Sequence, residues 1–84
     1  MSENLSSQQV IEIFSQYVIG NYSRLPRAIV SGKGSYLYDA EGNEILDMSA
    51  GWAVSGIGHC HPKVVEAIMN QAEKLLHIDN TFYI

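Results

Sequence analysis

The chain has 84 residues, a formal net charge of -4 at pH 7, 46% hydrophobic residues and only 17% charged residues. A chain this short forms at most one small domain and buries roughly 60–65% of its unfolded surface, so its core must be thin. The five basic residues are scattered along the chain, which excludes a basic face for nucleic acid. The low share of charge predicts apolar surface that is available to a partner.

Targeting and redox signals are absent from the sequence. No run of about 18 apolar residues occurs, and Met1 to Gln9 lacks the charged and apolar regions of a signal peptide, so we expect neither a membrane span nor secretion. Cys60 is the single cysteine and cannot form a disulfide within the chain. These features predict a cytoplasmic protein.

The first predicted element is a helix over residues 7–19. Ser6, followed three residues later by Gln9, has the form of a capping box, and apolar residues then recur at helical spacing. Gly20 is expected to end the helix as a left-handed C-cap. Pro26 prevents an immediate restart, because the residue before a proline avoids the helical conformation.

A small antiparallel β-sheet or hairpin is predicted over residues 28–48. Residues 28–31, 35–39 and 44–48 are rich in β-favouring side chains, and Gly42 is expected to supply a positive φ in the turn before the last of them. Isolated hairpins are marginal in water, so this sheet needs cover from elsewhere.

Residues 49–61 are rich in small residues and glycine, which predicts a loop without regular structure. Pro62 suits the first turn of a second helix, and an apolar stripe carries that helix to about residue 76. Residues 77–84 end on an apolar, aromatic-rich run with no stop signal. The sequence therefore predicts one unfinished structural unit, an α+β fragment.

The most conspicuous chemical cluster is His59-Cys60-His61, to which His77 could add a third imidazole. These are the usual zinc ligands, yet neighbouring residues seldom point at one ion from a loop, so no metal site is predicted. The same geometry weighs against Cys60 as a nucleophile with a flanking histidine base. We expect one histidine to hydrogen-bond the backbone where the loop meets the second helix.

Trp52 is a large aromatic residue inside the glycine-rich loop. It is either a plug in the core or a wall of a ligand pocket, and the pattern alone favours the plug because most aromatic side chains are structural.

Three spaced motifs resemble the class III aminotransferases, and within that family the acetylornithine, ornithine and 4-aminobutyrate enzymes. Residues 34–47 follow G-x-x-L-x-D-x-x-G-x-x-x-x-D, residues 51–54 follow G-x-A-V, and residues 58–68 follow G-H-x-H-P-x-V-V-x-A-I. The resemblance covers about residues 22–84.

This resemblance implies part of the small domain of a fold-type-I enzyme that uses pyridoxal 5'-phosphate (PLP), normally as a homodimer. Such enzymes move an amino group from an N-acetylornithine-like or other ω-amino donor to 2-oxoglutarate. Lys33, Lys63 and Lys74 match none of the family's lysine motifs, so the PLP-binding lysine and the large PLP-binding domain are expected outside this chain. We therefore expect no catalytic, cofactor-binding or metal-binding residue here, and no activity from the 84 residues alone.

The resemblance places Gly51, Trp52 and Ala53 near the substrate and, more weakly, Tyr83. Many relatives have isoleucine where this chain has Trp52, and ornithine enzymes have tyrosine, so the amino donor stays open. Two other readings remain: a free-standing interaction module without catalysis, and a small metal-binding domain.

Overall fold

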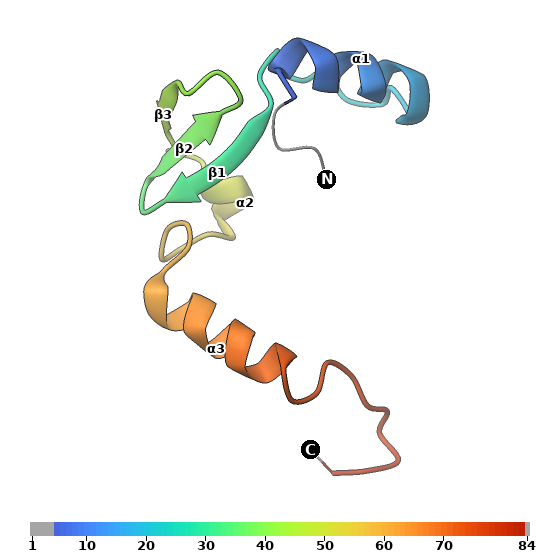
Figure 1. The fold of residues 1–84 in the computed structure, drawn as a ribbon, viewed down its shortest axis with the longest axis vertical. Helices are drawn as coiled ribbons and strands as arrows, with labels where there is room; N and C mark the ends of the chain where they lie inside the picture. The colour runs from blue at the N-terminus through green and yellow to red at the C-terminus, as the bar shows by residue number, and fades with distance from the viewer. Residues whose placement is uncertain (1–4, 84) are drawn as a thin grey trace.

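The computed structural model describes residues 5–83; Met1–Asn4 and Ile84, which include the polar start and the last apolar residue, lie outside this range. The elements follow one another as an elongated chain (Figure 1), with one helix beyond each end of a small sheet. In order they are α1 (Ser7–Tyr17), β1 (Ile29–Lys33), β2 (Tyr36–Asp39), β3 (Glu44–Leu46), α2 (Ala50–Ala53) and α3 (Pro62–Ala72).

Helix α1 begins with the predicted capping box. The Ser6 hydroxyl accepts from the Gln9 N–H at 3.2 Å, and the Gln9 side chain accepts from the Ser6 N–H at 2.9 Å. The predicted end was wrong: the helix stops at Tyr17, two residues early, and Gly20 has no positive φ. The Val18 N–H donates the last hydrogen bond of the helix to the Phe14 carbonyl, and Val18 itself is extended. The helix therefore ends without a left-handed glycine as its C-cap.

The three strands form one antiparallel sheet in the order β1-β2-β3, which confirms the predicted small antiparallel sheet. Leu37 at its centre faces Gly32 on β1 and Ile45 on β3. Gly42 has a φ of 85° in the turn between β2 and β3, as expected from its place in the sequence. The pairing slips by one residue near Ile29, where β1 carries an irregularity.

Helix α3 begins at Pro62, and His61 caps it because its Nδ1 accepts from the Lys63 N–H at 3.2 Å. The predicted end at residue 76 was too late, since regular helix stops at Ala72. Beyond that point the Gln71 side chain donates to the Leu75 carbonyl at 2.9 Å, and the chain leaves the helix in a turn.

Within residues 5–83 no apolar side chain is buried; the only two buried residues are polar, Ser7 at 7% and Asp39 at 2% exposure. Apolar side chains of α1 and α3 are open to solvent, including Phe14 and Ile68. No helix of this part of the chain is long and apolar enough to cross a membrane. The described residues therefore have no apolar core of their own.

Candidate functional site

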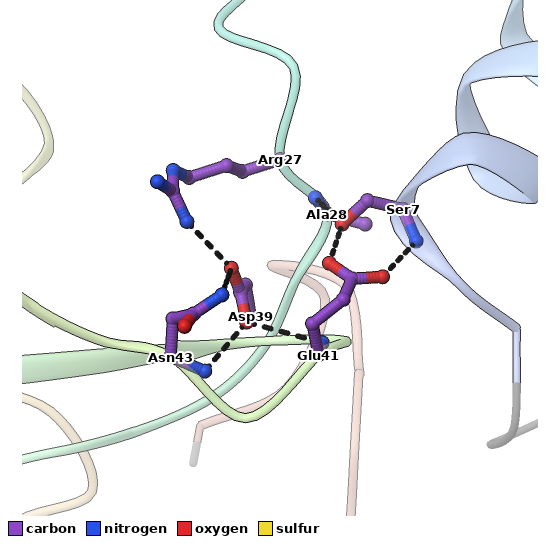
Figure 2. Close-up of polar contacts among 6 residues, drawn as sticks. All are labelled: Ser7, Arg27, Ala28, Asp39, Glu41 and Asn43. Atoms are coloured by element: carbon purple, nitrogen blue, oxygen red, sulfur yellow. Dashed lines mark hydrogen bonds and ion pairs between the residues drawn. The ribbon is translucent and has the colours of Figure 1, made fainter.

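A polar cluster joins the start of α1 to the hairpin (Figure 2). The Glu41 carboxylate accepts from the Ser7 N–H at 2.7 Å and from the Ser7 hydroxyl at 2.5 Å. The Ser7 oxygen in turn accepts from the Ala28 N–H at 2.8 Å. These bonds to the Ser7 hydroxyl and N–H lower the pKa of Glu41.

The second carboxylate of this cluster, Asp39, also accepts hydrogen bonds on both of its oxygens. It accepts from the side chain and backbone of Asn43 at 3.0 and 2.8 Å, from the Glu41 N–H at 3.1 Å, and from Arg27 at 2.8 Å. The Asn43 amide is the largest cause of its lowered pKa, with Arg27 adding to it. Every partner belongs to the fold itself, so the cluster fastens α1 to the hairpin and offers no free group for catalysis.

The glycine-rich segment is a loop only in part, because within residues 49–61 α2 (Ala50–Ala53) is a single left-handed helical turn. Its non-glycine residues Ala50, Trp52 and Ala53 have φ values of 51°, 64° and 64°, and Gly51 has 56°. A backbone bond from the Ala53 N–H to the Ser49 carbonyl, 2.9 Å long, closes the turn. Left-handed helix costs a non-glycine residue roughly 1–2 kcal/mol, so surrounding structure must hold this turn in place.

Trp52 is exposed in the described part of the chain. The residue is 97% exposed, so no other residue of 5–83 covers its ring, and the choice between a core plug and a pocket wall stays open for the whole protein. Gly51 and Ala53 are exposed beside it. The turn therefore projects an aromatic ring outward, with no contact in residues 5–83 that buries it.

Tyr83, the fourth residue that the resemblance places near the substrate, is also fully exposed. The C-terminal segment that carries it, red in Figure 1, lies beyond α3 and away from α2. The described part of the chain does not bring Tyr83 and Trp52 together.

A contact between Asp47 and His59, which the sequence did not reveal, supports the left-handed turn. Asp47 Oδ1 accepts from the N–H groups of Ser49 and Ala50 at 3.1 and 3.0 Å, and its Oδ2 lies 2.7 Å from His59 Nε2. The hydrogen bond from His59 is the main cause of a lowered Asp47 pKa, followed by the Ala50 N–H. Asp47 is the last residue of a motif and His59 belongs to another, but nothing in the sequence joins them.

The metal hypothesis finds no support in the geometry. The His59 ring is bonded to Asp47, while His61 accepts a backbone N–H, which confirms the predicted histidine bond at the start of α3. Cys60 is exposed and has a φ of 54°. In residues 5–83 no three His, Cys, Asp or Glu side chains are grouped so as to hold a metal ion.

The described residues do not by themselves fit a PLP site. The cofactor requires a lysine amine inside a pocket that also holds its phosphate. Here Lys33 ends β1, Lys63 lies in the first turn of α3, and Lys74 follows that helix; all three are exposed and lie on different elements. Two hollows lie along α3, one lined largely by apolar side chains and the other by Lys63, Glu66, Ala67 and Asn70. Lys63 borders both, but neither hollow brings a second lysine or arginine to it. That this chain alone binds no cofactor stays a prediction.

Comparison with known proteins shows that the chain is similar to part of several aminotransferases. The chain is 47% identical to acetylornithine aminotransferase from Methanocaldococcus jannaschii over 79 residues, 94% of this chain and 20% of that protein. A crystal structure of acetylornithine aminotransferase from Elizabethkingia anophelis matches with a TM-score of 0.92 and 34% identity, covering 95% of this chain and 21% of that one. Taurine:2-oxoglutarate aminotransferase from Bifidobacterium kashiwanohense, in complex with PLP and glutamate, matches with a TM-score of 0.83 and 26% identity, covering 100% and 19%.

The family profile of class III aminotransferases matches residues 17–84. The chain therefore belongs to the class III aminotransferase family. It spans about a fifth of the length of the relatives it matches.

Proposed function

We propose that the whole protein containing this chain is a PLP-dependent aminotransferase that moves an amino group from an N-acetylornithine-like or other ω-amino donor to 2-oxoglutarate. The observation that carries the proposal is 47% identity to an acetylornithine aminotransferase across 94% of the chain. The similar taurine:2-oxoglutarate enzyme supports the acceptor. N-acetylornithine and taurine share a terminal amino group, which supports the donor class.

In this proposal the chain supplies a wall on the substrate side of the active site. Trp52 offers an exposed aromatic face, the kind of surface that lines ligand pockets, and it is presented by a strained turn of the sort that persists where function requires it. Gly51 and Ala53 flank it and leave the approach to the ring open. Tyr83 is a second exposed aromatic residue, and in this proposal the rest of the protein brings it to the same substrate.

The chemistry itself belongs to the rest of the protein. PLP, when bound, withdraws electrons from the substrate carbon that carries the amino group. The lysine and the phosphate-binding groups for it lie outside this chain in our proposal, so the 84 residues alone neither bind PLP specifically nor transaminate. The uncovered apolar faces of α1 and α3 support cover by the remaining polypeptide and by a second subunit in a homodimer. A cytoplasmic location is part of the proposal and rests on the sequence alone.

The test is a donor panel with the whole protein, PLP and 2-oxoglutarate. N-acetylornithine, ornithine, 4-aminobutyrate and taurine are supplied in turn, and glutamate formation is followed with a donor-free reaction as control. We expect turnover with at least one of these donors and the highest kcat/KM with N-acetylornithine. Absence of glutamate with every donor would contradict the proposed activity.

The exposed apolar faces of α1 and α3 also fit an interaction module that binds a partner through them. The intact mass of the natural protein separates the two functions. A mass near that of 84 residues favours the module, whereas a mass several times larger favours the aminotransferase.

A further inference from the structure

The left-handed turn α2 is tied to the rest of the chain by one carboxylate. Asp47 Oδ1 accepts from the Ser49 N–H, the Ser49 hydroxyl and the Ala50 N–H at 3.1, 3.3 and 3.0 Å. These bonds hold the two residues that lead into the turn. Because the Asp47 side chain is only 9% exposed, water competes little for this carboxylate.

The other oxygen of the carboxylate is fixed by His59. Its Nε2 lies 2.7 Å from Asp47 Oδ2, so the ring nitrogen donates to the carboxylate and the proton is on Nε2. Asp47 thereby cannot rotate without losing bonds on both oxygens at once. The orientation of the turn depends on the position of this imidazole.

His59 is in turn locked to the hairpin. Its N–H and carbonyl exchange hydrogen bonds with Gly34, at 2.8 Å to the Gly34 carbonyl and 3.0 Å from the Gly34 N–H. Its ring packs over Gly32, where a Cβ would lie 2.9 Å from both the Cβ and the Cγ of His59. A continuous set of contacts therefore runs from the hairpin through His59 and Asp47 to the turn.

Trp52 depends on this set of contacts because its own side chain has no packing that could orient it. The residue is 97% exposed, so within the described chain the backbone of the turn is what sets the direction in which its Cα–Cβ bond projects. Three non-glycine residues of that turn are in the disfavoured left-handed region and would leave it if released.

We propose that Asp47 and His59 are a positioning pair that holds the left-handed turn and so aims Trp52 at the amino donor. Neither residue needs to touch the donor for this role. The inference rests on the proposed function for the identity of the ligand, but the geometry of the pair stands without it.

The test uses the whole protein and compares His59→Phe with His59→Gln. Phenylalanine fills the space over Gly32 but cannot donate to Asp47, whereas a glutamine amide can. We expect His59→Phe to lower kcat/KM for the donor about 10-fold, mostly through KM, and His59→Gln to restore it to within about 3-fold. Tyr38→Phe, which removes an exposed hydrogen bond to Glu44 on the same sheet, is the matched control and should leave donor kinetics unchanged.

A double-mutant cycle shows whether His59 acts through Trp52. In a Trp52→Ala background, His59→Phe should lower kcat/KM by less than about 2-fold further, because the residue that it positions is gone. Full additivity of the two losses would overturn the proposal. If His59→Phe does not fold, Asp47→Asn serves instead, because its amide oxygen can still accept from Ser49 and Ala50 while the charge facing His59 is lost.

A readout independent of activity separates failure of this inference from failure of the proposed function. The near-ultraviolet circular dichroism of Trp52, taken as the difference between each protein and its Trp52→Phe version, reports how rigidly the ring is held. This signal should weaken in His59→Phe and return in His59→Gln even if no donor is turned over. An unchanged signal in His59→Phe would refute the positioning role, whereas an inactive wild-type protein refutes only the proposed reaction.

Discussion

At the scale of single residues, the exposure of Trp52 leads to a direct prediction for the whole protein. Trp52→Ala should lower kcat/KM for the amino donor by roughly 10–200-fold, the range for altered apolar pocket contacts, with little change in melting temperature. A core plug would instead cost roughly 3–5 kcal/mol of folding free energy when truncated. Donor kinetics and melting on one preparation separate the two; a large stability loss with unchanged kcat/KM would end the pocket-wall proposal.

The carboxylate of Glu41 predicts a pH dependence. Its pKa is lowered in the folded state by the Ser7 hydroxyl and N–H, so its stabilising contribution is complete above its unfolded pKa near 4.5 and is lost as the pH falls through the lower folded value. Glu41→Gln should therefore reduce the melting temperature at pH 7, with a difference that shrinks below about pH 4. Glu66→Gln, at an exposed position of α3, is the control. A deficit that stays constant from pH 7 to pH 3 would contradict the assigned bonds.

At the scale of elements, two glycines with equal space around them offer a matched test of the hairpin turn. A Cβ added at Gly42 or at Gly20 meets nothing within 4 Å, but only Gly42 has a positive φ, of 85°. Gly42→Ala should therefore destabilise the fold by about 1 kcal/mol through backbone conformation alone, while Gly20→Ala should be neutral or slightly stabilising. Equal melting temperatures for the two variants would show that the turn relaxes to another type.

The features that could be predicted from the sequence are those determined by residues close to one another in the chain. The capping box of Ser6 and Gln9, the turn at Gly42 and the helix start at Pro62 each depend on residues within a few positions of one another. Helix ends were predicted two to four residues too late, because an apolar stripe does not show where a backbone turns away.

The candidate site was harder to predict than the fold around it. Ala50 and Trp52 in a left-handed turn run against their own conformational preference, so no propensity argument could anticipate α2. Asp47 and His59 meet only because a backbone bridge brings Gly34 to His59, and no sequence pattern records that tertiary contact. The position of Trp52 was identified from a resemblance, while its exposure required the structure.

At the scale of the whole molecule, hydrogen bonds and ion pairs connect the elements of the described chain, but no apolar core does. The carboxylates of Asp39, Glu41 and Asp47 are all engaged within the fold, yet residues 5–83 bury no apolar side chain. We therefore expect the isolated 84 residues to self-associate or to fold poorly, because helices and a small sheet are marginal without apolar cover. Sedimentation combined with amide exchange measures this. A monodisperse monomer with strongly protected amides in both α1 and α3 would show the chain to be self-sufficient.

The central claim is that this chain shapes the substrate side of an aminotransferase while the cofactor chemistry lies elsewhere in the protein. The most direct measurement treats the isolated chain with PLP, reduces with borohydride and maps the labelled lysines by mass spectrometry. We expect slow, substoichiometric labelling spread over Lys33, Lys63 and Lys74, since all three residues are exposed and Lys63 only borders open hollows along α3. Stoichiometric labelling of a single lysine would contradict it, because the chain would then contain a PLP site of its own.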